Sequence, residues 1–285
     1  MALDLVQTIA ELRARIARTR AAGPVGFVPT MGALHAGHAS LIAQARRDSA
    51  TVVVSIFVNP IQFDRAEDFE RYPRALDADV AMCRALGVDV VFAPPATEMY
   101  PAPLELTVEV GRLADHLCGR SRPGHFKGVA TAVLKLLEIV QPDKAYFGEK
   151  DAQQLAIVRR MVSDFNLPVG IVSVPTVREP DGLALSSRNQ RLNPAERMLA
   201  PALYRALAEV KGAVAAGISD AAELTRRGSE QIPIDERLRL EYIEIVDPID
   251  FQPVARVRGA VVAAGALWVG ATRLIDNMRC TPGEP

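Results

Sequence analysis

Strand-like apolar runs alternate with helical patterns through most of the first 176 residues, and this alternation limits the fold more than any other feature of the chain. The runs are PVGFVPT, TVVVSIFVN, VDVVFAP, KAYFG and VGIVSVPTV, and the intervening helical segments include ASLIAQARRDS, VATAVLKLLEIV and DAQQLAIVRRMVSDF. Such alternation predicts an α/β fold, a doubly wound parallel sheet with helices on both faces. Ligands of such sheets bind beyond the carboxyl ends of the strands.

The pattern changes after about residue 177. A polar, turn-rich segment is followed by two helical stretches and then by the strand-like pieces LEYIEIVD, GAVVAAGALWVG and TRLIDNM. We therefore expect a larger domain at residues 1–176 and a smaller α+β domain at 177–285. Residues 1–20 have the pattern of a first amphipathic helix.

Composition excludes several classes of protein. A net charge of −1 gives no general attraction for nucleic acid or an anionic membrane. The longest apolar run, GAVVAAGALWVG, is too short for a membrane-spanning helix. The start of the chain lacks a secretory signal pattern, and three widely spaced cysteines suggest neither disulfides nor a zinc site. We expect a cytoplasmic protein that binds neither nucleic acid nor membrane.

The segment PTMGALHAGH follows the PVGFVPT strand and precedes a helix. Gly32 and Gly37 would let the backbone turn tightly and approach a ligand, and His38 would lie just before the helix, where an anion is favoured. A neutral imidazole there can donate a hydrogen bond to a phosphate. The spacing of His35 and His38 also suggests a metal, but no further ligand lies nearby, so none is expected. An ordinary polar turn is the alternative.

Three other segments carry polar or charged groups. Asn59 and Gln62 of VNPIQF suit a hydroxyl or carboxylate, or else simply cap a turn. The cationic RSRPGHFKG is either a mobile loop over an anionic ligand or a solvated surface loop. In YFGEKDAQQ, Lys150 stands unfavourably at a helix start unless an anion binds there, and Gln154 would face the same crevice as Asp151.

The segment LALSSRN lies just past the expected domain boundary. Its Ser186, Ser187 and Arg188 suit a triphosphate, and a serine-rich linker is the alternative. Together with His35 and Lys150 these groups can position ligands and stabilise phosphate charge, while no Ser-His-Asp or Cys-His set is evident. The chemistry predicted from the residues is nucleotidyl transfer, without a named substrate.

Six motifs together give a more specific result. PTMGALHAGH, SIFVNPIQF, RYPR, RPGHFKGVATAV, YFGEKDAQQ and LALSSRN, in this order, resemble the pantothenate synthetase (pantoate–β-alanine ligase) family. The resemblance implies a Rossmann-like nucleotidyltransferase domain, a C-terminal lid domain and a homodimer. It also implies that pantoate attacks the α-phosphate of ATP, and that β-alanine then attacks the pantoyl adenylate, with release of pyrophosphate and AMP.

The resemblance also assigns residues to ligands. His38, His35, Lys150 and Arg188 would be catalytic, with His38 as proton donor. Pantoate would contact Gln62, Gln154 and Asn59, and Gln62 would also contact β-alanine. Mg²⁺ would be bound with ATP, and Asp77 and Asp79 are interpreted as solvated helix residues. The ATP-binding set would be Met31, Gly32, Ala33, Leu34, His35, Ala36, Gly37, His38, Gly148, Glu149, Lys150, Asp151, Val177, Leu185, Ser186, Ser187 and Arg188.

Three alternatives remain open. An adenylyl- or cytidylyltransferase acting on another small acid or phosphate ester would not depend on β-alanine. A non-catalytic nucleotide-binding module would not need His35, His38, Lys150 and Arg188 together. A tRNA-charging fragment would need a nucleic-acid surface, for which the net charge gives no support.

Overall fold

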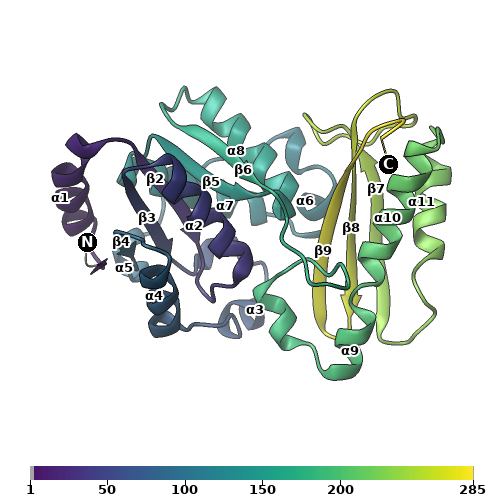
Figure 1. Cartoon of the computed structure of the whole chain (residues 1–285), viewed down its shortest axis with the longest axis horizontal. Helices are drawn as coiled ribbons and strands as arrows, with labels where there is room; N and C mark the ends of the chain where they lie inside the picture. Colours follow the sequence, from purple (N-terminus) through teal and green to yellow (C-terminus); the bar gives the residue numbers. More distant parts are fainter. Residues whose placement is uncertain (1–2, 285) are drawn as a thin grey trace. The chain divides into compact units, whose positions relative to one another are not determined.

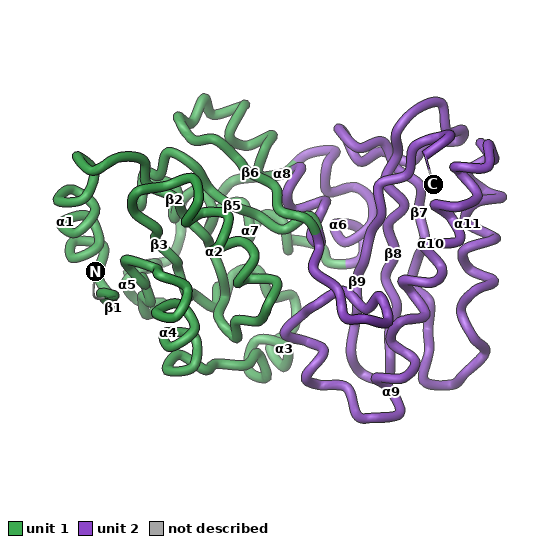
Figure 2. The backbone as a smooth tube through the Cα atoms, in the orientation of Figure 1, with its two compact units in different colours: residues 1–110, 122–149, 157–175 green, residues 111–121, 150–156, 176–285 purple. Residues whose placement is uncertain are grey.

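The computed structural model describes residues 3–284 and divides into two compact units (Figure 2). The first unit comprises residues up to 110, 122–149 and 157–175. The second comprises 111–121, 150–156 and the residues from 176 onward. The sequence pattern did not predict that the short segments 111–121 and 150–156 belong to the second unit.

The first unit contains a six-stranded parallel sheet with the order β1-β4-β3-β2-β5-β6 (Figure 1). Five of its six strands correspond to the five apolar runs. The strands are β1 (Asp4–Val6), β2 (Val25–Thr30), β3 (Thr51–Ile56), β4 (Val90–Phe92), β5 (Lys144–Gly148) and β6 (Gly170–Val174). In register, Val25 pairs with Thr51 of β3, and Gly26 pairs with Lys144 of β5. The predicted parallel sheet is confirmed.

Helices cover both faces of this sheet. On one face, Leu41 and Ile42 pack in one core with alternate strand residues such as Val28 and Val52. Phe27 precedes Val28 in β2, so its side chain lies on the opposite face of the sheet. It is equally buried, because that face is covered too. The helices of the first half of the chain are α1 (Ile9–Thr19), α2 (Ala36–Asp48), α3 (Ala66–Glu70), α4 (Leu76–Ala85), α5 (Ala96–Met99), α6 (Leu117–Ser121), α7 (His125–Val140) and α8 (Ala152–Asp164).

The second unit contains an antiparallel sheet of three strands in the order β7-β8-β9, with α10 and α11 packed along it (Figure 1). One face of β8 packs on α10, and the other lies in a core with Leu117, Tyr242 and Phe251. The elements are α9 (Pro194–Leu199), α10 (Ala202–Ala215), α11 (Ala221–Glu230), β7 (Leu238–Val246), β8 (Val261–Val269) and β9 (Thr272–Cys280). The predicted smaller α+β part is therefore present.

The N-terminal prediction is wrong in part. Residues 4–6 form strand β1 beside β4, and the helix begins only at Ile9. Thr8 sets that start, because its side chain accepts the N–H of Glu11 while the Glu11 carboxylate accepts the N–H of Thr8. The first two residues of the predicted helix lie outside the described part of the chain.

Candidate active site

Three of the predicted segments follow neighbouring strands of the parallel sheet. The segment from Met31 follows β2, Asn59 and Gln62 come shortly after β3, and Gly148 ends β5. Because β2 lies between β3 and β5, their carboxyl ends are adjacent at one edge. The chain runs from β2 to β3 on one side and reaches β5 on the other, so this edge is a topological switch point, where ligands of such sheets bind.

The two histidines form the N-terminal cap of α2. His35 is the N-cap residue, and its Nδ1 accepts the N–H of Gly37 at 3.1 Å. His38 lies in the first helical turn, and its Nδ1 accepts the N–H of His35 at 3.2 Å. A nitrogen that accepts carries no proton, so this geometry assigns both rings as neutral, with the proton on Nε2. Each imidazole can therefore donate a hydrogen bond through Nε2.

The sequence interpretation of this turn needs two corrections. His38 does not precede the helix but belongs to it, and Gly37 is helical. The left-handed backbone is found earlier, at Gly32 (φ +82°) and Ala33 (φ +50°). An added Cβ at Gly32 would meet an oxygen of Asp79 at 2.9 Å, so glycine is required there by both conformation and space.

Most N–H groups of the turn bond within the protein. The N–H of Gly32 donates to Thr30 Oγ1, those of Ala33 and Leu34 donate to Asp79, and that of His35 donates to His38. The turn therefore differs from a glycine-rich phosphate loop, in which consecutive backbone N–H groups bind the phosphate. The side chains of His35 and His38 therefore close the N-terminal turn of α2.

The interpretation of Asp79 as a solvated helix residue is wrong. Its side chain projects from α4, is only 3% exposed, and accepts the N–H of Ala33 at 2.9 Å and of Leu34 at 2.7 Å. Burial raises the pKa of the carboxyl, and the two backbone donors oppose that rise. Position on a polar-looking helix gave no sign of this contact, because the partners lie more than forty residues away in the sequence.

A second cluster joins three of the predicted residues. Gln62 Nε2 lies 3.1 Å from Met31 Sδ, and Gln62 Oε1 accepts from Asn59 Nδ2 at 2.9 Å. Asn59 is 2% exposed and also receives the Tyr100 hydroxyl at 2.8 Å. The Asn59 amide therefore bonds to Gln62 and is itself held by Tyr100, a more specific arrangement than turn capping.

Two residues that support this cluster were not identified from the sequence, Tyr100 and Gly128. The Gly128 carbonyl accepts from Asn59 Nδ2 at 3.1 Å. A Cβ at Gly128 would lie 2.2 Å from the carbonyl oxygen of Ile61, so glycine allows α7 to approach the segment that carries Gln62. A glycine inside a helical pattern was the available signal.

The segment RSRPGHFKG is not a loop throughout, because its two ends lie in helices. Arg120 lies in the last turn of α6, and α7 begins at His125. Arg122 is paired with Asp64 at 2.8 Å, and His125 Nδ1 lies 2.8 Å from the Gln62 carbonyl oxygen. These cations therefore have structural partners.

In the second unit, the segment 177–188 folds back on itself. The N–H of Leu185 donates to the Val177 carbonyl at 3.0 Å, so the two ends of the predicted adenine and triphosphate segment are adjacent. The Ser186 side chain accepts the N–H of Arg188 and caps the 3₁₀ helix Ser187–Arg191. Ser186 is therefore the N-cap of this helix, and Ser187 and Arg188 are its first two residues.

The remaining second-unit residues surround the start of α8. Lys150 and Asp151 belong to the 3₁₀ helix Glu149–Asp151, with Lys150 Nζ 3.7 Å from an Asp151 oxygen. Asn277 Nδ2 donates to the Lys150 carbonyl at 2.9 Å, which ties this short helix to β9. Gln154 follows in α8 and is half-buried. Its neighbour Gln153 is buried and instead bonds to the 113–118 segment.

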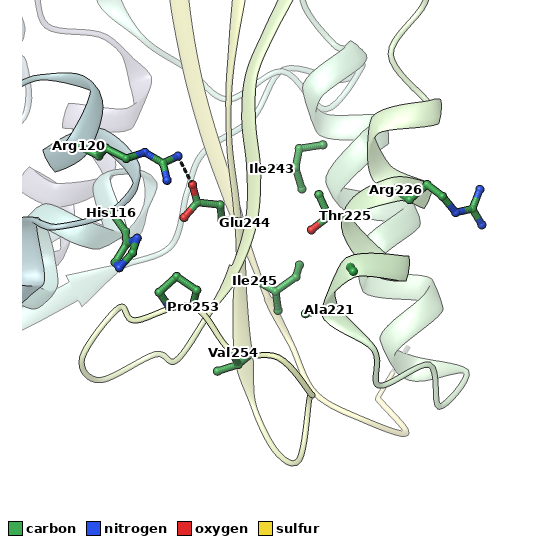
Figure 3. A pocket seen from close by; sticks show the side chains of 11 residues that line it. His116, Arg120, Ala221, Thr225, Arg226, Ile243, Glu244, Ile245, Pro253 and Val254 are labelled. Atoms are coloured by element: carbon green, nitrogen blue, oxygen red, sulfur yellow. Dashed lines mark hydrogen bonds and ion pairs between the residues drawn. The ribbon is translucent and has the colours of Figure 1, made fainter.

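The second unit also contains a pocket of about 520 Å³ (Figure 3). It is lined mainly by apolar residues of α11, β7 and the segment that follows β7, with the ion pair between Arg120 and Glu244 at one side. No residue of the predicted site lines it. We do not assign the reacting groups to this pocket.

Two negative findings concern residues 3–284. No set of three or more histidine, cysteine, aspartate or glutamate side chains in this range is arranged to hold a metal ion. Within the same range, every helix falls short of the length and apolar character needed to cross a bilayer.

Known proteins extend these observations. Residues 4–279 match the family model described as pantoate-beta-alanine ligase. A bifunctional pantoate ligase/cytidylate kinase from Thermosynechococcus vestitus is 54% identical over 95% of this chain, and the chain spans about half (53%) of that relative's length.

Two solved structures have the same architecture. The pantothenate synthetase of Thermus thermophilus superposes with a TM-score of 0.93 at 48% identity, covering 98% of this chain and 100% of that one. A pantoate-beta-alanine ligase from Francisella tularensis, complexed with beta-gamma ATP and beta-alanine, gives 0.82 at 36% identity, covering 97% of each chain. The motifs, the fold and the match over nearly the whole chain agree, and the chain belongs to the pantoate–β-alanine ligase family.

Proposed function

We propose that the chain condenses (R)-pantoate with β-alanine at the expense of ATP, forming pantothenate, AMP and pyrophosphate. The observation that carries this proposal is the pair of capping histidines at the switch point of the sheet, in a chain of the pantoate–β-alanine ligase family. Two neutral imidazoles whose Nε2–H groups can donate suit a reaction that develops negative charge on phosphate oxygens.

In the first step the pantoate carboxylate attacks the α-phosphorus of ATP and pyrophosphate leaves. His35 and His38 donate hydrogen bonds to the phosphates, and the positive end of α2 adds to their effect. Gln62, held by Asn59, and Gln154 bind pantoate, which fixes the carboxylate for in-line attack. The protein supplies position and charge stabilisation, and the substrate supplies the nucleophile.

In the second step the β-alanine amine attacks the acyl carbon of the pantoyl adenylate. The acyl–oxygen bond to the phosphate breaks, AMP leaves, and the amine loses a proton as the amide forms. Gln62 also contacts β-alanine. The Francisella tularensis relative named with beta-alanine and beta-gamma ATP supports the choice of these two substrates.

The rest of the nucleotide site in this proposal comes from Gly148 and Glu149 of the first unit and from residues of the second unit. Gly148 to Asp151 bind the nucleotide, with Lys150 on its phosphates, and Val177 packs beside the adenine. Leu185 to Arg188 close on the triphosphate, and the region 177–285 acts as a lid on the 1–176 domain. Arg188 and Lys150 supply the cationic charge that ATP requires.

Mg²⁺ enters with ATP. Residues 3–284 contain no cluster of metal-ligating side chains that would bind it without ATP. The carboxylate of Asp79 already accepts two backbone N–H groups. A cation carried by the triphosphate would neutralise phosphate charge. We also propose that the protein works in the cytoplasm as a homodimer.

The test is product analysis with purified protein, Mg-ATP and pantoate, with and without β-alanine. We expect AMP and pantothenate in equal amounts only when all substrates are present. Pyrophosphate release without amide formation from any small amine would favour a nucleotidyltransferase acting on another acid. No consumption of ATP under any of these conditions would favour a nucleotide-binding module and refute the proposal.

A further inference from the structure

The side chain of Asp79 binds the turn between β2 and α2 from a distant part of the chain. Both of its carboxylate oxygens accept backbone N–H groups of this turn, one from Ala33 at 2.9 Å and the other from Leu34 at 2.7 Å. The side chain comes from α4, so the contact joins a helix to a turn 45 residues earlier in the sequence.

The geometry requires such a restraint. Gly32 and Ala33 both have left-handed backbone conformations, and for alanine that conformation is unfavourable. Two charge-assisted hydrogen bonds from consecutive N–H groups favour this local arrangement over the extended alternatives. The packing is close, since a Cβ on Gly32 would meet Asp79 Oδ2 at 2.9 Å and Ile56 Cγ2 at 3.0 Å.

The turn leads directly into the two histidines. Leu34 bonds to Asp79 and is followed at once by His35, the N-cap of α2. The orientation of the His35 ring depends on its bond to the Gly37 N–H, and that of the His38 ring on its bond to the His35 N–H. A shift of the turn would therefore move both imidazoles.

We propose that Asp79 is a positioning residue that fixes the 31–35 turn and thereby aims His35 and His38 at the phosphates of ATP. Asp79 does not touch the nucleotide: it is 3% exposed, and its oxygens are directed at the backbone. The inference rests on the proposed function for the identity of the ligand, and on the hydrogen bonds alone for the restraint.

The sign of the effect separates positioning from simple electrostatics. Replacing Asp79 by Asn removes a negative charge from the neighbourhood of an anion-binding turn, which on charge alone should strengthen ATP binding. The amide, however, offers one acceptor and one donor, and so leaves one of the two N–H groups without its partner. Positioning therefore predicts weaker ATP binding in Asp79→Asn.

The measurement is the Kd for ATP by titration calorimetry, together with KM and kcat for each substrate. For Asp79→Asn we expect the Kd and KM for ATP to rise about 10- to 100-fold, which corresponds to the loss of one hydrogen bond to a charged group. The KM for β-alanine should stay within about 2-fold of the wild-type value. Unchanged or stronger ATP binding would overturn the proposal.

A matched control is Asp89→Asn in the same unit. The Asp89 carboxylate also accepts a backbone N–H, from Val52 at 2.8 Å, and pairs with Arg46, but at the amino end of β3. This variant should lose stability without a rise in the Kd for ATP. Equal loss of ATP affinity in the two variants would show that general destabilisation is responsible and would contradict the proposal.

A second measurement uses the wild-type chain, in case the variant does not fold. Hydrogen exchange in the absence of nucleotide should show the amides of Ala33 and Leu34 protected. Rapid exchange at both would overturn the restraint. Because ATP affinity and exchange need no turnover, a wild-type protein that makes no pantothenate would refute the proposed function while leaving this inference open to its own test.

Discussion

The two units use buried polar groups in different ways. In the first unit, Asp79 and Asn59 are almost fully buried and bond to the segments that follow strands β2 and β3. In the second, buried and half-buried charges pair with one another. Arg178 holds Asp276 through two bonds of 2.6 and 2.9 Å, and Arg273 holds Glu241. The first arrangement fixes segments that follow strands, and the second connects β9 to β7 and to the segment 177–188.

The difference follows from what each sheet must carry. Segments at the carboxyl edge of a parallel sheet have no strand partner, so their N–H groups need side-chain acceptors if the segments are to keep one conformation. The antiparallel strands already satisfy their backbone, and charged side chains instead link β9 to β7 across β8 and link β9 to the segment that carries Arg178. Changes in the first set should therefore alter chemistry, and changes in the second should alter stability.

The largest expected effect tests the first half of this comparison. His38→Ala should lower the rate of adenylate formation by about 10²- to 10⁴-fold, the usual contribution of one such group. Because Nδ1 of His38 also accepts a backbone N–H, His38→Asn is the sharper variant: its Oδ1 can keep that bond while the Nε2–H donor is lost. We expect pyrophosphate release to fall in both variants and thermal unfolding of His38→Asn to match the wild type. Near wild-type turnover of His38→Asn would remove His38 from the chemistry.

The second prediction concerns the ion pair between Arg273 and Glu241 in the second unit. Arg273 donates to both oxygens of Glu241 and to Ser121, and it is only 15% exposed. Arg273→Ala leaves Glu241 buried without its partner and should lower the free energy of unfolding by about 3 kcal/mol. Denaturant unfolding measures this loss. Arg226→Ala, at an exposed pair on α11, is the control and should change stability little. A fall in kcat without loss of stability in Arg273→Ala would contradict the expectation that this ion pair serves stability and not chemistry.

The third prediction is that the stability contributed by the Arg273–Glu241 ion pair depends on pH. Burial opposes ionisation of Glu241, but the hydrogen bond and charge of Arg273 outweigh it and lower the pKa of Glu241 to about 2. A lowered pKa stabilises the fold above the ordinary range of the carboxyl, near pH 4.5, and that contribution is lost as the pH falls to about 2.

The Glu241→Gln variant isolates this contribution. It should be less stable than the wild type by about 2 kcal/mol at pH 7, the scale of a hydrogen bond to a charged group, and the gap should close between about pH 4.5 and pH 2. Unfolding curves of both proteins across that range give the difference directly. A gap that stays constant with pH would mean that the pairing does not depend on the charge of Glu241.

The smallest effect tests the division of labour within the first unit. Gln62→Ala removes the amide held by Asn59 and should raise the KM for pantoate about 10-fold, which is about 1.4 kcal/mol, while the KM for ATP changes little. Steady-state kinetics with each substrate varied in turn measure both values. Equal increases for pantoate and ATP would show that Gln62 supports the turn rather than pantoate.

The sequence alone determined the strands of both sheets other than β1, and the strand ends near which several candidate residues lie. Apolar runs with period two and helices with period 3.6 are local patterns, and they identified β2 to β6 and the strands β7 to β9. Histidines flanked by glycines after a strand identified the turn before α2. The strand β1 was missed because it has only three residues and depends on pairing with β4.

Only the tertiary structure decided how the candidate residues are held. Asp79 is read from sequence as a solvated helix residue, and its role appears only when α4 packs against a turn far back in the chain. The same holds for Tyr100 and Gly128, which reach Asn59 from distant segments. Local sequence determines periodicity and capping, because those depend on residues a few positions apart. Partners of buried polar groups are set by the folded chain, because a buried carboxylate or amide must take its hydrogen bonds from whichever groups the packing brings to it.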